Sequence, residues 1–155
     1  MMNNTVTSEP FKFMGIGVQT TNENNQAAKD LEELWKRFYL EGIMIRIPDA
    51  TGSDIYTIYT DYEKDYTDKY TAMIGLKVKS LTDIPTGFIG REFGGGNFTK
   101  YTAKGKMPDA IIHTWMQIWS DDTQLNRSYD YDFEVYGSKS DNGENSEVDI
   151  YVSVK

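Results

Sequence analysis

The segment SYDYDFEVYG, residues 128–137, brings carboxylates and tyrosines together at a spacing that could do chemistry. Side chains alternate between the two faces of a β-strand, so as a strand this segment places Glu134 and Tyr136 on the same face as Asp130 and Asp132. Such a face is typical of the wet side of an antiparallel sheet. A carboxylate held among aromatic rings would instead select for positive charge, because burying it without a cation is costly. Alternation alone leaves both interpretations of Glu134 open.

A second set of candidate residues is aromatic and follows helical spacing. Two stretches, 27–42 and 107–122, each predict an amphipathic helix. Their apolar stripes consist of Leu31, Leu34, Trp35 and Phe38 in the first, and of Ile112, Trp115, Met116 and Trp119 in the second. Aromatic residues on such stripes more often pack in a core than bind a ligand. Large flat rings on two helices can also stack on flat ligands or on cations, so both roles stay open.

Other familiar chemistries find little support in the chain. His113 is the single histidine and there is no cysteine, so no metal site or cofactor is expected. The acidic stretch 61–68 lacks the glycine and the spaced final glutamate of a calcium loop, and we expect it to form a solvated turn. The glycines of FGGGNF fit a flexible turn rather than a phosphate loop, and no G-x-S-x-G motif or catalytic triad is present. A standard hydrolase mechanism is therefore not indicated.

The elements that must position these residues follow one order twice. We expect strands at 11–21, 55–62 and 70–79, then at 97–105, 129–137 and 147–155, with a helix after the first strand of each triplet. The chain thus reads as two β-α-β-β halves, an α+β architecture. One such half cannot bury both faces of its short sheet, so the two should associate and leave a groove between them. We expect one domain over 11–155, after a poorly ordered N-terminus at 1–10.

Composition limits the partners of the protein. The 155 residues carry a net charge of −8, which would repel nucleic acid and an anionic membrane surface, whereas cationic ligands are tolerated. The chain contains neither a signal peptide nor a long apolar run, and the lack of cysteine fits a reducing compartment. These features predict a cytoplasmic protein. Aromatic residues make up 14% of the sequence, a surplus that suits a β-rich core or a pocket with flat walls.

The succession FMGIGVQTTNE, LEELWKRF, IYTIYTDYEKDYTDKYTAMIGLKV, KGKMPDAIIHTWMQIW, DYDFEVYG and EVDIYVSVK resembles the GyrI-like small-molecule-binding family, also known as bacterial transcription activator, effector-binding domains. The resemblance implies two halves related by a pseudo-two-fold axis, with a central groove for bulky hydrophobic compounds that are often cationic or aromatic. It further implies that Glu134 is the acidic residue at the bottom of the pocket. The implied walls are Trp35, Phe38, Tyr59, Trp115, Trp119 and Tyr136.

Three functions follow as hypotheses. The first is a stand-alone binder of hydrophobic or cationic compounds, without direct nucleic-acid binding because no helix-turn-helix segment precedes the resemblance. The second is a hydrolase of strained, cyclopropane-type genotoxic compounds, in which Glu134 activates water and Tyr59 or Tyr136 donates a hydrogen bond. The third is a protein that modulates gyrase or interacts with another large partner, which the sequence does not identify.

Overall fold

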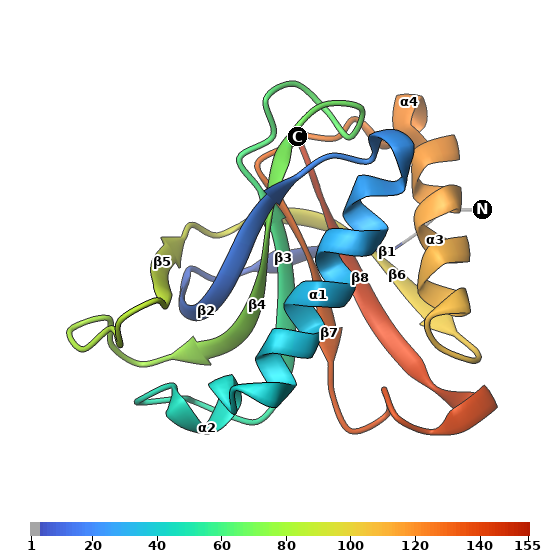
Figure 1. Cartoon of the computed structure of the whole chain (residues 1–155). Helices are drawn as coiled ribbons and strands as arrows, with labels where there is room; N and C mark the ends of the chain where they lie inside the picture. The colour runs from blue at the N-terminus through green and yellow to red at the C-terminus, as the bar shows by residue number, and fades with distance from the viewer. Residues whose placement is uncertain (1–3) are drawn as a thin grey trace.

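The computed structural model describes residues 4–155 and shows one curled antiparallel sheet with two long helices (Figure 1). The first half of the chain contains β1 (Asn4–Ser8), β2 (Phe11–Thr20), the 3-10 turn η1 (Glu23–Asn25), α1 (Gln26–Leu40), α2 (Ile43–Arg46), β3 (Ile55–Thr60) and β4 (Tyr70–Val78). The second half contains β5 (Ile89–Phe93), β6 (Gly96–Lys104), α3 (Asp109–Ser120), α4 (Asp122–Leu125), β7 (Tyr131–Tyr136), the 3-10 turn η2 (Gly143–Asn145) and β8 (Glu147–Val154).

The strand order confirms the α+β fold of two similar halves. The eight strands run β1-β6-β8-β7-β3-β4-β2-β5 across the sheet, and every adjacent pair is antiparallel. In each half the strand before the long helix pairs with the last strand, which pairs with the strand after the helix. The two halves meet where β3 pairs with β7, with Thr57 opposite Glu134. The candidate carboxylate therefore lies at the centre of the sheet.

Two edge strands were not expected from the sequence. Within the N-terminal stretch predicted to be poorly ordered, residues 1–3 lie outside the described residues, whereas Asn4–Ser8 form β1 and pair with β6. At the other edge, β5 pairs with β2. Each edge strand thus completes the sheet beside the opposite half. The partner lies far away in the sequence, so local patterns carry no signal of this pairing.

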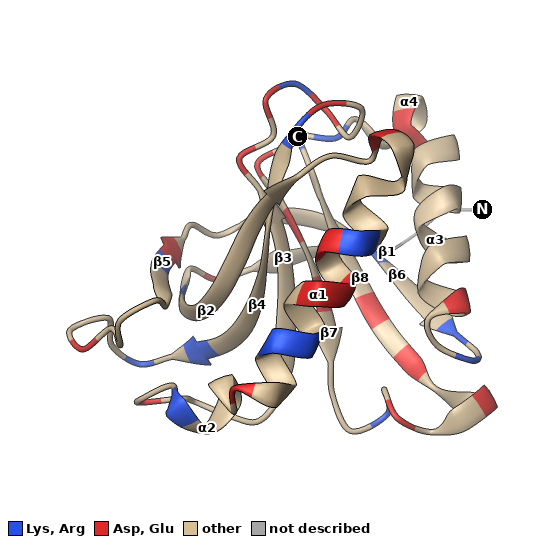
Figure 2. Ribbon diagram, viewed as in Figure 1, with Lys and Arg blue, Asp and Glu red and all other residues tan. Residues whose placement is uncertain are grey.

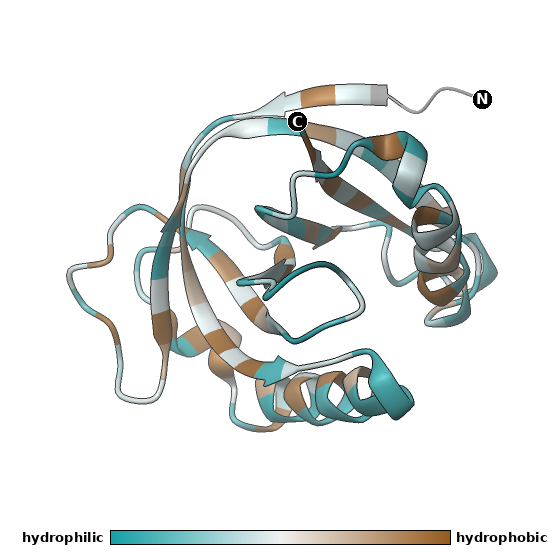
Figure 3. Ribbon diagram, turned by 90° about the horizontal axis from the view of Figure 1, so that it is seen from above, coloured by the Kyte–Doolittle hydropathy of each residue, from teal (hydrophilic) through white to brown (hydrophobic). Residues whose placement is uncertain are grey.

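The sheet has one face covered by helices and one lined by aromatic rings. Buried side chains of α1, among them Leu34 and Phe38, pack on β2 and β4, while α3 packs on β6 through Ala110 and Ile118. We call this the helix face; Figure 3 shows the same arrangement from above, with apolar positions along both helices. The other face, here the aromatic face, carries one cluster with a contribution from every strand: Val6, Phe13, Ile58, Met73, Phe93, Phe98, Tyr131 and Tyr151.

The predicted inward stripe of the second helix was partly wrong. Ile112 and Met116, two of its four expected members, are 52% and 56% exposed. The segment DAIIHTWMQIWS is apolar around most of its circumference, so periodicity does not define a unique buried face. Contacts with β6 and β8 select the stripe that contains Ala110 and Ile118 instead.

The sheet is curled, and β2 approaches β4 closely at one pair of residues. Tyr131 of the central strand β7 and Phe93 of the edge strand β5 lie with ring centroids 4.8 Å apart, so the sheet wraps around the aromatic cluster. Gly15 and Gly75 face each other on β2 and β4. A Cβ atom on Gly75 would lie 2.1 Å from the carbonyl oxygen of Met14, which only glycine avoids.

Charged residues are dispersed over the molecule. Figure 2 shows acidic and basic positions on helices, strands and connectors alike, rather than one sign gathered on one element. Within residues 4–155, no helix is both long and apolar enough to cross a membrane.

Candidate functional site

Glu134 is buried between the sheet and the two long helices. Its side chain is 1% exposed, although it sits on the strand face that carries polar residues in the sequence. The alternation predicted for β7 is confirmed, since Asp132, Glu134 and Tyr136 point to the helix face and Phe133 to the aromatic face. Asp130 precedes the strand and is exposed. Asp130 and Glu134 therefore differ in exposure, although alternation places them on the same face of the strand.

Three neutral side chains donate hydrogen bonds to this carboxylate. The Tyr59 hydroxyl donates to Oε2 at 3.0 Å and the Trp115 indole N–H to the same oxygen at 2.6 Å. The Tyr136 hydroxyl donates to Oε1 at 2.7 Å. The donors come from β3, α3 and β7, so both halves of the fold contribute. Among the residues that the structure describes, no basic side chain forms a salt bridge with Glu134.

Burial and hydrogen bonding act on Glu134 in opposite directions. Loss of hydration raises the pKa of its carboxyl above the ordinary value of 4.5, and the hydrogen bonds from Tyr136, Trp115 and Tyr59 oppose that rise without cancelling it. The same burial, together with the nearby carboxylate, raises the pKa of Tyr59 and of Tyr136 well above 10.0. Both phenols therefore remain protonated donors at neutral pH.

This raised pKa predicts a pH-dependent stability. The folded protein holds the Glu134 proton to higher pH than the unfolded chain does, so the stabilising contribution is complete below about pH 4.5 and is lost as the pH rises through the raised folded pKa. We expect the difference in unfolding free energy between the wild type and Glu134→Gln to fall over this window, by about 1.4 kcal/mol for each pH unit by which the pKa is raised. Urea unfolding of both proteins between pH 4 and 8 measures it, and a difference that stays constant across this range would contradict the expectation.

The predicted aromatic wall residues are only partly assembled around Glu134. Besides its three donors, Trp35 of α1 packs edge-on against Tyr136 at 5.0 Å between ring centroids. Trp119 lies one turn beyond Trp115, with their rings 6.4 Å apart. Phe38 is 1% exposed and belongs to the hydrophobic core beneath α1, where it contacts Trp35 but not the carboxylate.

The connector between β3 and β4, residues 61–69, contributes aromatic residues that the sequence did not single out. The sequence suggested a solvated acidic turn, and Asp61 and Glu63 are indeed exposed. Tyr66 instead stacks on Trp119 with ring centroids 5.5 Å apart and planes 10° apart. The Asn22 amide holds the Tyr66 backbone carbonyl at 2.9 Å. The connector (green in Figure 1) therefore covers the Trp119 end of the aromatic set.

A buried ion pair anchors this connector. Arg127 donates to Asp132 at 2.6 Å, and both side chains are almost completely buried. The Tyr62 hydroxyl donates to the same carboxylate oxygen at 2.5 Å, and the other oxygen accepts from the backbone N–H of Ser153 at 2.8 Å. The guanidinium also lies over the Tyr129 ring, 4.2 Å from its centroid. Asp132 therefore has a structural partner set that Glu134 lacks.

Among the described residues there is no cluster of side chains that could hold a metal ion. They contain no group of three or more His, Asp or Glu side chains that could hold an ion, and His113 is on the exposed side of α3. Two cavities lie on the aromatic face, and Glu134 lines neither of them. The candidate site is therefore the carboxylate with its three donors, under Trp35, Trp119 and Tyr66.

This fold, with its central buried carboxylate between two helices, defines the chain as a GyrI-like effector-binding domain. The family model described as "Cass2: Integron-associated effector binding protein" matches residues 5–154, and the chain belongs to this family.

Similar proteins agree with that assignment. An integron cassette protein from the mobile metagenome of Vibrio cholerae is 25% identical, with a TM-score of 0.78 over 98% of this chain and 95% of that one. The structure of SAV2435 bound to tetraphenylphosphonium has a TM-score of 0.83 at 20% identity, over 100% of this chain and 94% of the other. YobU of Bacillus subtilis, a candidate transcriptional regulator, is 22% identical over 147 residues, which cover 93% of this chain and 92% of YobU.

Proposed function

We propose that this protein binds bulky hydrophobic cations between α1 and α3, with Glu134 as the counter-charge. The observation that carries the proposal is the partner set of Glu134, a carboxylate that is 1% exposed and is held by Tyr59, Trp115 and Tyr136. All three donors are uncharged. A buried carboxylate that lacks a cationic partner in the protein gains most from a cation brought by a ligand.

The aromatic side chains suit the rest of such a ligand. Trp35, Trp119 and Tyr66 present rings beside the carboxylate site, and rings attract cations through their π-faces as well as by apolar contact. In the structure, Tyr66 stacks on Trp119, and Trp35 packs against Tyr136. A bulky ligand must therefore separate some of them, and Tyr66 is a natural candidate to move because it lies on a connector rather than on a helix or strand.

Family membership supports the same chemistry. The chain belongs to an effector-binding family, and a protein with the same fold has been solved with tetraphenylphosphonium, a cation surrounded by four phenyl rings. That ligand has the two properties that the Glu134 site would select, a delocalised positive charge and a large apolar surface. It is therefore the probe of choice.

A pair of probes with one shape and opposite charges tests the proposal. We expect tetraphenylphosphonium to bind at least about tenfold more tightly than tetraphenylborate, because both offer four phenyl rings but only the cation can pair with Glu134. Isothermal titration calorimetry gives both affinities, and tryptophan fluorescence reports binding because Trp115 contacts the carboxylate. Equal affinities for the two ions would refute the role of charge. If neither ion binds, the proposed site is refuted.

The hydrolase alternative uses the same carboxylate with Tyr59. Water activation requires a water molecule on a free lone pair of the base. Glu134 accepts three hydrogen bonds at 2.6–3.0 Å, two on Oε2 and one on Oε1, which leaves one acceptor position on Oε1 for a water. The carboxylate is only 1% exposed, so a water and a substrate reach it together only if surrounding side chains move. Because the family of this chain is described by effector binding, binding is the function that we favour. Unchanged recovery of a cyclopropane-type compound after incubation, judged by mass spectrometry, is the corresponding expectation.

A further inference from the structure

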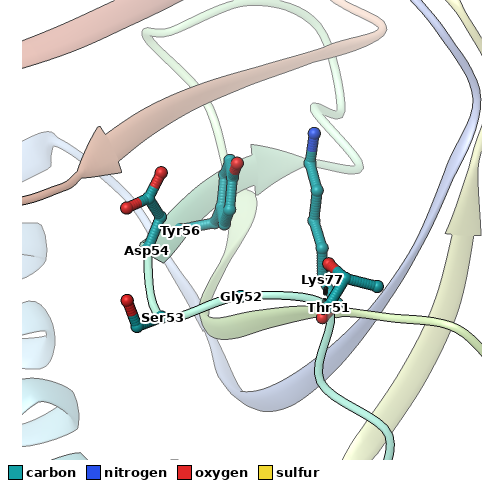
Figure 4. Close-up of a pocket in the computed structure, with 6 residues that line it drawn as sticks. All are labelled: Thr51, Gly52, Ser53, Asp54, Tyr56 and Lys77. Atoms are coloured by element: carbon teal, nitrogen blue, oxygen red, sulfur yellow. Dashed lines mark hydrogen bonds between the residues drawn. The ribbon is translucent and has the colours of Figure 1, made fainter.

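A cavity lies on the face of the sheet opposite to Glu134. It has a volume of about 280 Å³ and opens beside the start of β3 and the end of β4, where Thr51, Gly52, Ser53, Asp54, Tyr56 and Lys77 line it (Figure 4). Tyr56 and Lys77 belong to the aromatic face, because the Tyr56 ring packs near Phe133. The tryptophans and the carboxylate of the proposed cation site lie on the helix face. The sheet itself separates the two sites.

Lys77 is the distinctive side chain of this cavity. Its ammonium nitrogen lies 4.5 Å from the centroid of the Phe11 ring and 4.9 Å from that of Tyr56. Figure 4 shows its side chain standing beside the Tyr56 ring, on the same side of the backbone. Within residues 4–155, no carboxylate lies within salt-bridge distance of it. Burial lowers the pKa of Lys77, and the charge of Asp54 acts in the opposite direction.

The neighbouring cavity on the same face contains a lysine that is already paired with a carboxylate, unlike Lys77. It has a volume of about 380 Å³ and includes Lys100 in its lining. The ammonium of Lys100 already pairs with Asp149 at 3.6 Å, and Glu147 lines the same space. Lys139 also lines that cavity, and Asp54 lines both cavities. Among the lysines that line the two cavities, Lys77 is the one whose ammonium lies over two aromatic rings and forms no salt bridge within residues 4–155.

We propose that the Lys77 cavity binds a small planar aromatic anion of the aromatic-carboxylate class. The carboxylate would pair with the Lys77 ammonium, which the rings of Phe11 and Tyr56 hold in place. The aromatic part would lie against the Tyr56 ring, which stands beside the Lys77 side chain (Figure 4). The cavity volume restricts the ligand to one or two fused rings.

The test uses 2-naphthoate as the anion and 2-naphthamide as its neutral analogue. We expect saturable binding of 2-naphthoate by calorimetry, with at least about tenfold weaker binding of 2-naphthamide, because the neutral amide cannot form an ion pair. This comparison needs no variant, so it remains valid even if a substitution at Lys77 prevents folding. Equal binding of the two compounds, or no saturable binding of 2-naphthoate, would overturn the proposal.

Substitutions then locate the site. Lys77→Met keeps the apolar stem and removes the charge, and it should weaken 2-naphthoate binding at least about tenfold. Lys100→Met removes the same charge from a lysine that is already paired, and it should leave the affinity within about twofold. Tetraphenylphosphonium affinity should be unchanged in Lys77→Met, and 2-naphthoate affinity unchanged in Glu134→Gln. These crossed measurements distinguish failure of this site from failure of the cation site. Loss of 2-naphthoate binding in Lys100→Met but not in Lys77→Met would overturn the assignment.

Discussion

Replacing Glu134 by glutamine is expected to weaken tetraphenylphosphonium binding about 100-fold, equivalent to about 2.7 kcal/mol. The amide has nearly the same shape but no charge, so the ligand loses its counter-ion in a site from which water is excluded. The amide also has a single oxygen acceptor in place of two, so it cannot accept from all three donors as Glu134 does. Calorimetric titration at pH 7.5 measures the change, and near-ultraviolet circular dichroism verifies that the variant is folded.

Asp130→Asn is the matched control. Asp130→Asn changes the net charge by the same amount as Glu134→Gln. Asp130 lies just before the same strand, but its side chain is exposed. Its effect on the affinity should stay below about twofold, because exposed charges are screened by solvent and salt. If Asp130→Asn and Glu134→Gln weaken binding equally, then the net charge of the protein, rather than a buried counter-ion, attracts the cation.

The second large effect is expected on stability, at the buried pair of Arg127 and Asp132. Arg127→Met should lower the unfolding free energy by about 3–5 kcal/mol, because it leaves a buried carboxylate without its cation. The hydrogen bonds that Asp132 receives from Tyr62 and Ser153 place the expected loss toward the lower end of that range. Urea denaturation followed by tryptophan fluorescence measures the difference.

Two further variants test the reason for this loss. Arg37→Met breaks an exposed pair with Glu41, at 3.2 Å, and should cost less than about 1 kcal/mol. Combining Arg127→Met with Asp132→Leu removes both buried charges, and the double variant should recover part of the stability lost in Arg127→Met. A double variant less stable than either single one would mean that packing, and not the unpaired charge, accounts for the effect.

The sequence by itself determined six of the strands and the two long helices, but not the edge strands β1 and β5. Alternation in 147–155 and the helical spacing of Leu34 and Phe38 identify such elements, because each pattern reflects the burial of one side of one local element. The strand expected at 70–79 is also present, although both of its faces are buried. The order of these elements predicted two β-α-β-β halves. The ends of the predicted elements differ from the observed ones by no more than a few residues, as expected where capping and pairing fix the boundaries.

Sequence patterns did not predict contacts between segments that are distant in the sequence. The edge strands β1 and β5 pair across the two halves, and Tyr66 packs on a tryptophan from the other half of the chain. A turn that is polar by composition was expected to be solvated, but two of its tyrosines are held by Asp132 and Trp119. Nothing local to the connector encodes those partners.

The three acidic residues near β7 separate what the sequence determined from what only the tertiary structure decided. Alternation placed Asp130, Asp132 and Glu134 on one face, and it could not say whether that face meets water. Tertiary structure decided that Asp130 is exposed, that Asp132 is neutralised by Arg127, and that Glu134 is buried with uncharged donors from positions 19 and 75 residues away as well as from its own strand. The electrostatic character of a carboxylate depends on its surroundings in space, and those surroundings exist only once both halves have folded together.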